Sequence, residues 1–294
     1  MGYNISPMRN KCTDHKSPHD VPNPGTVRNE GLCHVNNCGE QPPQKEMAPQ
    51  IETATGHVAA STGTANRAVH NKVQLWKNGP CWADKNIGAE NPEDYGFYFW
   101  WGDTVGYKHE GGVWVASDGS SPNFEFGKNH APTSGKSLSA MKSEGWVVGG
   151  DGRRSLLEKL FALGLREDSV LTPTHDAAQV HWGGEWRMPT NQELKDLCKK
   201  CDWTWTKMNG VDGYAIRGRG DYASGSIFLP GAGFGHEMLL GHVGSTGAYW
   251  ASVPHSDYSN SEAWDLGFNS GRHAVSYYYR YFGQPIRPVQ GATK

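Results

Sequence analysis

The sequence predicts an α+β domain in which helical segments precede short antiparallel strands. Two helical patterns, at residues 153–165 and 190–201, are followed by five β-prone runs separated by Gly, Ser, Asn and Asp. The composition agrees, because 38 glycines and 12 tryptophans indicate loop-rich structure held by large side chains rather than a helical bundle.

The first 72 residues differ in composition from the rest of the chain. Of the 12 Trp, 12 Tyr and 9 Phe residues, only Tyr3 precedes Gln74. Because such a segment cannot bury enough surface to offset its chain entropy, we expect residues 1–72 to be a polar arm or linker, disordered or ordered by contact with another surface. The domain itself is expected at 73–290, followed by a short tail at 291–294.

The charge pattern excludes several classes of partner. The formal net charge is -2 and there is no run of like charges, which argues against nucleic-acid binding by phosphate neutralisation. No stretch of eighteen consecutive apolar residues occurs, so we expect no membrane-spanning helix. The start of the chain, "MGYNISPMRNKC", lacks the apolar segment of a signal peptide.

The cysteines divide between the arm and the domain. Cys12, Cys33 and Cys38 lie in the arm, where nearby histidines could complete a zinc site, but the spacing from Cys33 to Cys38 is not that of a standard ligand pair. We therefore predict no metal and no cofactor. In the domain, Cys81 stands apart from Cys198 and Cys201, which close the second helical segment.

The segment "TNQELKDLCKKC" (190–201) has the features of a helix that packs on a core. Thr190 and Glu193 form a capping-box pattern at its start. One apolar face is formed by residues at i, i+3, i+4 and i+7, which are Leu194, Leu197, Cys198 and Cys201. We interpret the two cysteines as core residues rather than a redox pair, which would lie at a helix N-terminus; a disulfide to Cys81 is the alternative in an exported protein.

The other elements follow the same reasoning. The segment 153–165 places four apolar residues together, Leu156, Leu157, Leu160 and Phe161, and Gly164 fits a C-cap. Strands are expected in five runs after residue 201, at 213–218, 224–234, 247–254, 262–268 and 274–282.

Several motifs occur in a characteristic order: "PCWADKNIGAENPEDYGFYFWWGDT" (80–104), "DAAQVHWGGEWRMPT" (176–190), "CDWTWTKMNGVDGYAI" (201–216), "GSIFLPGAGF" (225–234), "GAYWASVP" (247–254) and "RYFGQPIRPVQ" (280–290). Together they resemble the Fibrobacter succinogenes major paralogous domain family. This resemblance implies a C-type-lectin-like fold, which is also that of formylglycine-generating enzymes and of the variable proteins of diversity-generating retroelements. It covers 73–290, with a longer and more individual segment at 107–168, and it implies an extracellular, cell-surface or phage location.

The motifs favour binding over catalysis. Formylglycine-generating enzymes use cysteines near the end of the domain, and this chain has none after Cys201. The sequences "ENPED" and "AWDL" do not match the calcium–sugar motifs of C-type lectins. A hydrolase remains the alternative, with a general base or metal at one of two loose clusters: His175, Asp176 and His181, or His236, Glu237 and His242.

Five tryptophans and two arginines are interpreted as structural. Trp182, Trp186, Trp203, Trp205 and Trp250 are expected to anchor core and loops, with a sugar-stacking platform as the alternative. Arg187 and Arg287 are expected to brace loops through their guanidinium donors. Gly183 and Gly184 indicate backbone conformations that other residues resist.

The stretch "SYYYRYFGQ" (276–284) carries the functional prediction. Segment 255–284 is rich in Asn, Tyr, Ser, Asp and His, as in the retroelement-diversified proteins that the chain resembles and in antibody contact loops. We predict a ligand-binding surface for a protein or glycan, formed by Tyr258, Asn260, Trp264, His273, Tyr277, Tyr278, Tyr279 and Tyr281. The alternatives are a purely buried strand or a structural module of a surface assembly.

Strand geometry sharpens this prediction. Alternation places Tyr277, Tyr279 and Tyr281 on one face, and Tyr278 with Arg280 and Phe282 on the other. Because burying Arg280 is costly, we expect at least two of the four tyrosines to be substantially exposed.

Overall fold

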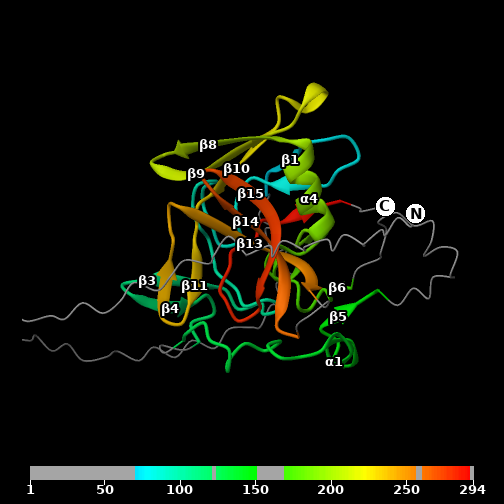
Figure 1. The fold of residues 1–294 in the computed structure, drawn as a ribbon, viewed down its shortest axis with the longest axis vertical. Coiled ribbons are helices and arrows are strands. Elements are labelled where there is room, and N and C mark those ends of the chain that lie inside the picture. The colour runs from blue at the N-terminus through cyan, green and yellow to red at the C-terminus, as the bar shows by residue number, and fades with distance from the viewer. Residues whose placement is uncertain (1–69, 121–123, 151–168, 256–259, 292–294) are drawn as a thin grey trace, which may run out of the picture. The chain divides into compact units, whose positions relative to one another are not determined.

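The computed structural model describes residues 70–120, 124–150, 169–255 and 260–291. Its strands are β1 (Lys72–Gln74), β2 (Cys81–Ala83), β3 (Tyr107–Glu110), β4 (Val113–Ala116), β5 (Val147–Val148), β6 (Val170–Leu171), β7 (Trp186–Arg187), β8 (Asp202–Met208), β9 (Val211–Arg217), β10 (Ser226–Pro230), β11 (Phe234–His236), β12 (Leu239–Gly241), β13 (Thr246–His255), β14 (Glu262–Asn269), β15 (Arg272–Tyr279) and β16 (Val289–Gln290). The helices are α1 (Leu138–Ser143), α3 (Ala177–Trp182), α4 (Asn191–Lys200) and a 3-10 turn (Gly220–Tyr222). This is a fold of small antiparallel sheets with few helices, consistent with the α+β class (Figure 1).

The strands form several small sheets. One has the order β1-β2-β16-β7, a second β10-β9-β8 and a third β13-β14-β15, and three further sheets have two strands each: β3-β4, β5-β6 and β11-β12. All paired strands run antiparallel. The five predicted β-prone runs are confirmed as β9, β10, β13, β14 and β15, whereas β8 was not predicted.

Helix α4 confirms the prediction for residues 190–201. The Thr190 hydroxyl accepts the backbone N–H of Glu193, and the Glu193 carboxylate accepts the N–H of Thr190, so both halves of the capping box are present. The predicted apolar face packs into the main hydrophobic cluster, with Cys198 at its margin. Burial raises the pKa of the Cys198 thiol to about 12 and that of Cys201 to about 11, as expected for cysteines that pack as small hydrophobes. Cys81 is also a free thiol.

Two short helices, α1 and α3, are absent from the prediction. Helices α1 and α3 have six residues each, and Asp176 caps α3 by accepting two backbone N–H groups. Gly183, which ends α3, and Gly184 adopt positive φ angles of 65° and 60°, as their glycine identity predicted. The predicted helix at 153–165 lies outside the described residues, as does the arm up to residue 69.

Three of the predicted structural residues anchor the interior. Trp250 is fully buried and donates its indole N–H to the carbonyl of Phe99 at 2.9 Å. Arg187 pairs with Glu193 at 2.6 Å beside α4. Arg287 is 2 % exposed and donates to the side chain of Asn86 and to three main-chain carbonyls, those of Ala83, Asp84 and Phe228. The expectation that these side chains brace core and loops is therefore confirmed.

Candidate functional site

The four predicted tyrosines divide between surface and interior. Tyr277 is 39 % exposed and Tyr279 is 44 % exposed, while Tyr278 and Tyr281 are half-buried. The prediction that at least two would be exposed is confirmed. Strand β15, which carries three of them, pairs with β14 and contacts helix α4 (Figure 1).

Tyr277 belongs to a group of stacked rings. Its ring lies parallel to that of His255, with centroids 4.0 Å apart, and edge-on to the ring of Trp264 at 6.0 Å. Trp264 is the cross-strand partner of Tyr277, which explains this contact. On the other side of Trp264, the ammonium of Lys195 from α4 lies 4.8 Å from the ring centroid.

A second group of rings surrounds Tyr279. It stacks on Tyr281 at 5.1 Å, and Tyr281 in turn contacts Phe282 at 5.1 Å. His236 from β11 lies parallel to Phe282 at 4.4 Å. We refer to Trp264, Tyr277, Tyr279 and Tyr281 as the tyrosine surface; its members are held by ring contacts on their inner sides.

Tyr278 faces the opposite side of β15, as strand alternation predicts. Its ring packs edge-on against Phe282 at 4.6 Å and lies at the margin of two buried clusters. Tyr278 therefore packs against the interior and is not part of the surface that Tyr277 and Tyr279 form.

Arg280 corrects one step of the sequence reasoning. Its face was expected to avoid burial, yet the side chain is 1 % exposed. Its Nε–H donates to the carbonyl of Glu262 at 2.7 Å, and the other guanidinium donors reach three further carbonyls, those of Thr133, Lys136 and Asn260, at 3.1 to 3.2 Å. Burial lowers the pKa of Arg280 to about 10, so the group stays charged at neutral pH. Main-chain carbonyls, rather than water, solvate this cation.

The residue that follows Trp264 on β14 is a buried acid. Asp265 is fully buried, and burial raises the pKa of its carboxyl group to about 7. A hydrogen bond from Gln284 Nε2 at 3.2 Å acts in the opposite direction and lowers this pKa. Asp265 Oδ1 and Gln284 Oε1 are buried without a hydrogen-bond partner among the described residues. A proton on Oδ1 would supply the donor that Oε1 lacks, which favours the neutral acid.

Besides Tyr278, two of the described site residues, His273 and Asn260, are not part of the tyrosine surface. His273 stacks on Trp203 at 4.2 Å near the other end of β15, and burial lowers its pKa. Asn260 is exposed, and its carbonyl accepts a hydrogen bond from Arg280. Tyr258 lies outside the described residues. Conversely, sequence reasoning missed Lys195 and His255, which join the rings only through the strand register and the position of α4.

The two histidine clusters proposed for hydrolysis have structural contacts. Asp176 accepts three backbone N–H groups, from Ala178, Gln179 and Met188, and His181 Nε2 lies 2.8 Å from the carbonyl of Thr104. His236 and His242 each stack on a phenylalanine of β11 or of the C-terminal segment. Within the described part of the chain, the contacts of these histidines and of Asp176 are those of residues that hold loops and strands together.

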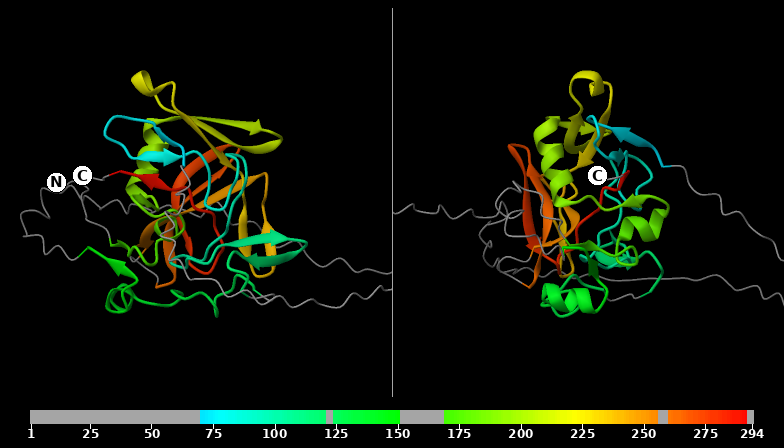
Figure 2. Two further views of the ribbon diagram at one scale, coloured as in Figure 1. Left: turned by 180° about the vertical axis from the view of Figure 1, so that it is seen from behind. Right: turned by 90° about the vertical axis from the view of Figure 1, so that its right-hand side faces the viewer.

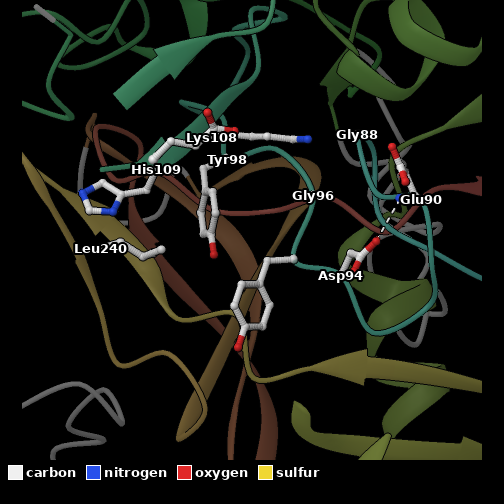
Figure 3. A pocket seen from close by; sticks show the side chains of 10 residues that line it. Gly88, Glu90, Asp94, Gly96, Tyr98, Lys108, His109 and Leu240 are labelled. Carbon is white, nitrogen blue, oxygen red and sulfur yellow. Dashed lines mark hydrogen bonds between the residues drawn. The ribbon is translucent and has the colours of Figure 1, made fainter. Parts of the chain in front are cut away.

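A hollow of about 250 Å³ is lined by none of the residues of the tyrosine surface (Figure 3). Its lining includes Glu90 and Asp94 on one side and His109 and Leu240 on the other. Asp94 is committed to its own loop, since it accepts the backbone N–H groups of Glu90 and Asn91.

No group of three or more His, Cys, Asp or Glu side chains is placed to hold a metal ion within the part of the chain that the structure describes. None of the helices in it has the length and apolar character needed to cross a membrane.

Comparison with known proteins gives no further assignment. No family model, curated protein or solved structure matches the chain.

Proposed function

We propose that this protein is a ligand-binding protein of C-type-lectin-like fold, related to the Fibrobacter succinogenes major paralogous domain family. Its tyrosine surface is the binding site, and the ligand is a protein or a glycan. The observation that carries the proposal is the exposure of Tyr277 and Tyr279 on one face of β15, with their rings held in place by stacking on His255 and Tyr281.

This arrangement has the properties of a recognition surface. A tyrosine provides a large contact area and a hydroxyl while losing little side-chain entropy on binding. Here the rings are already restrained by neighbours, which lowers that loss further. Clustered, partly exposed aromatic side chains of this kind are typical of interface residues that contribute most to affinity.

The support beneath the surface is independent of the tyrosines. Leu266 and Phe268 fix β14 in the core, and Arg280 ties the end of β15 to two other segments, 133–136 and 260–262. Changes at Tyr277 and Tyr279 are therefore expected to alter binding with little effect on folding.

The test uses the double variant Tyr277→Ser/Tyr279→Ser. The full chain is screened against a printed glycan array and a displayed peptide library, and affinity for each enriched probe is measured by biolayer interferometry. We expect the variant to lose about 2 kcal/mol or more of binding free energy, about 30-fold in Kd. Its free energy of unfolding should change by about 0.5 kcal/mol per substitution.

A matched control separates this effect from a general loss of exposed apolar area. Val115 and Leu239 are 42 % and 69 % exposed and lie outside the tyrosine surface, so Val115→Ser/Leu239→Ser should bind like the wild type. The proposal is wrong if the control and the tyrosine variant lose affinity equally, or if the tyrosine variant unfolds.

A further inference from the structure

Strand β15 lies at the edge of its sheet. The sheet has the order β13-β14-β15, and β15 pairs along all eight residues with β14 without a register shift. In the right-hand view of Figure 2 the orange-red strands of this sheet stand at the border of the described fold.

The pairing register determines which backbone groups of β15 point away from β14. Asn269 and Arg272 face each other across a two-residue turn. Eight residues after Arg272, the N–H of Arg280 donates to the carbonyl of Ser261 at 2.8 Å, so the even-numbered residues of β15 are the ones that bond to β14. In an antiparallel pair, hydrogen-bonded and non-hydrogen-bonded positions alternate. The residues whose N–H and C=O point outward are therefore the odd-numbered ones: His273, Val275, Tyr277 and Tyr279.

Most of these outward groups have no backbone partner in the part of the chain that the structure describes. The exception is the carbonyl of Tyr279, which accepts the N–H of Phe282 at 3.0 Å. Natural proteins usually protect such an edge with lysine, proline or a bulge. Strand β15, "RHAVSYYY", has none of these, so its edge offers a regular row of donors and acceptors to another strand.

The exposed tyrosines belong to this open edge, because Tyr277 and Tyr279 are two of the residues whose backbone groups point outward. A strand added at the usual spacing of about 4.8 Å would place alternate side chains beside Tyr277 and Tyr279. Two cations lie along the path of such a strand: Arg272 at the start of β15, and Lys195 above Trp264 near Tyr277. The nearby acid Glu262, opposite Tyr279, lies 3.4 Å from His255, and neither cation forms an ion pair with another described residue, so the charge along the strand favours an acidic partner.

We propose that β15 binds an extended, acidic peptide segment of a protein ligand, which adds to the sheet as a fourth strand. The inference rests on the proposed function, since it gives the class of ligand that the tyrosine surface accepts. Main-chain hydrogen bonds provide affinity in this mode, and the flanking side chains select the sequence.

The test removes one outward donor while leaving the β14–β15 ladder intact. Val275→Pro lacks the outward N–H, and an edge strand tolerates proline at a position whose N–H points away from the sheet. Val275→Ala is the matched control for the loss of the valine side chain. The probe is a phage-displayed library of random twelve-residue peptides selected on the full-length protein, followed by synthesis of the enriched peptides. We expect enriched peptides to be acidic and β-prone, Val275→Pro to weaken their binding about tenfold or more, and Val275→Ala to bind like the wild type.

A second measurement does not depend on the folding of the proline variant. Amide hydrogen exchange of the wild-type protein should show that a bound peptide protects the amides of His273, Val275 and Tyr277 more than those of their neighbours on β15. The proposal is overturned if no acidic extended peptide is enriched, if these amides gain no protection, or if Val275→Pro binds normally.

Other occupants give distinguishable results. A concentration-dependent dimer that Val275→Pro abolishes would identify the edge as a contact between two copies of the chain and would overturn the peptide proposal. If Tyr277→Ser/Tyr279→Ser loses glycan binding while Val275→Pro retains it, strand addition fails and the proposed function stands. If neither variant affects binding of any probe, both fail.

Discussion

Replacing Asp265 with asparagine is expected to stabilise the protein at neutral and alkaline pH. The wild-type carboxyl is fully buried beside Gln284, and its cross-strand neighbours, Trp250 and Ser276, carry no charge. Ionisation leaves Asp265 Oδ1 and Gln284 Oε1 as buried acceptors without a donor. An asparagine amide is neutral at every pH and can donate to Oε1 while accepting the Gln284 amide.

The magnitude follows from the pKa difference between the folded and unfolded states. The pKa of Asp265 is about 7 in the folded protein against an ordinary value of 3.8. Between these values the unfolded chain binds fewer protons than the folded one, so the free energy of unfolding falls as pH rises. At about 1.4 kcal/mol per pH unit, the loss reaches about 4 kcal/mol above pH 7 and is absent below pH 4.

Urea unfolding of both proteins at pH 4 to 8 measures this effect. The advantage of Asp265→Asn over the wild type should be near zero at pH 4 and grow to about 4 kcal/mol at pH 8. Asp221→Asn changes an exposed carboxylate and should show no such trend. A constant difference between Asp265→Asn and wild type across this range would refute the reasoning, because it would mean that Asp265 is already ionised in the folded state at low pH.

Three further predictions concern stability. Arg280→Met should lower the free energy of unfolding by about 3 kcal/mol or more, because it leaves several buried carbonyls without a donor; a loss below 1 kcal/mol in urea unfolding would contradict this. Thr190→Ala should cost about 1 kcal/mol through loss of the capping box, with Thr190→Ser close to wild type in the same assay. Removal of residues 1–69 should leave the Tm nearly unchanged in calorimetry, because Tyr3 is the one Phe, Trp or Tyr residue in this segment, which has little to bury in a core; a large drop would show that the arm joins the core.

Sequence reasoning succeeded where local chemistry decides the structure. The α4 helix was predictable because its cap and its apolar face lie within twelve consecutive residues, and β13 to β15 were predictable from β-prone runs bounded by turn residues. The exposure of at least two of the four tyrosines was predicted, but not which two, because the argument took the face of Arg280 to resist burial and that side chain is buried.

The remaining features depend on contacts between distant residues. Helices α1 and α3 are too short to be stable alone, so their sequences carry little helical signal. Arg280 is polar in sequence, and only the folded chain brings the carbonyls of residues 133, 136 and 260 around it. His255 and Lys195 reach Tyr277 and Trp264 through tertiary packing, which no local pattern encodes.

The position of Arg287 has a consequence for how the chain folds during synthesis. Its guanidinium bonds to residues that precede it by 201 to 204 positions, and β16 lies between β2 and β7 in a sheet whose other strands come from the first part of the domain. This sheet cannot close until residue 290 has left the ribosome, so the domain completes its folding only after its last strand has been made. Contacts of such long sequence separation also slow folding, and the half-made chain exposes an unpaired edge on β2. Ribosome-stalled chains ending near residue 280 should therefore remain sensitive to protease, whereas the released full-length chain becomes resistant.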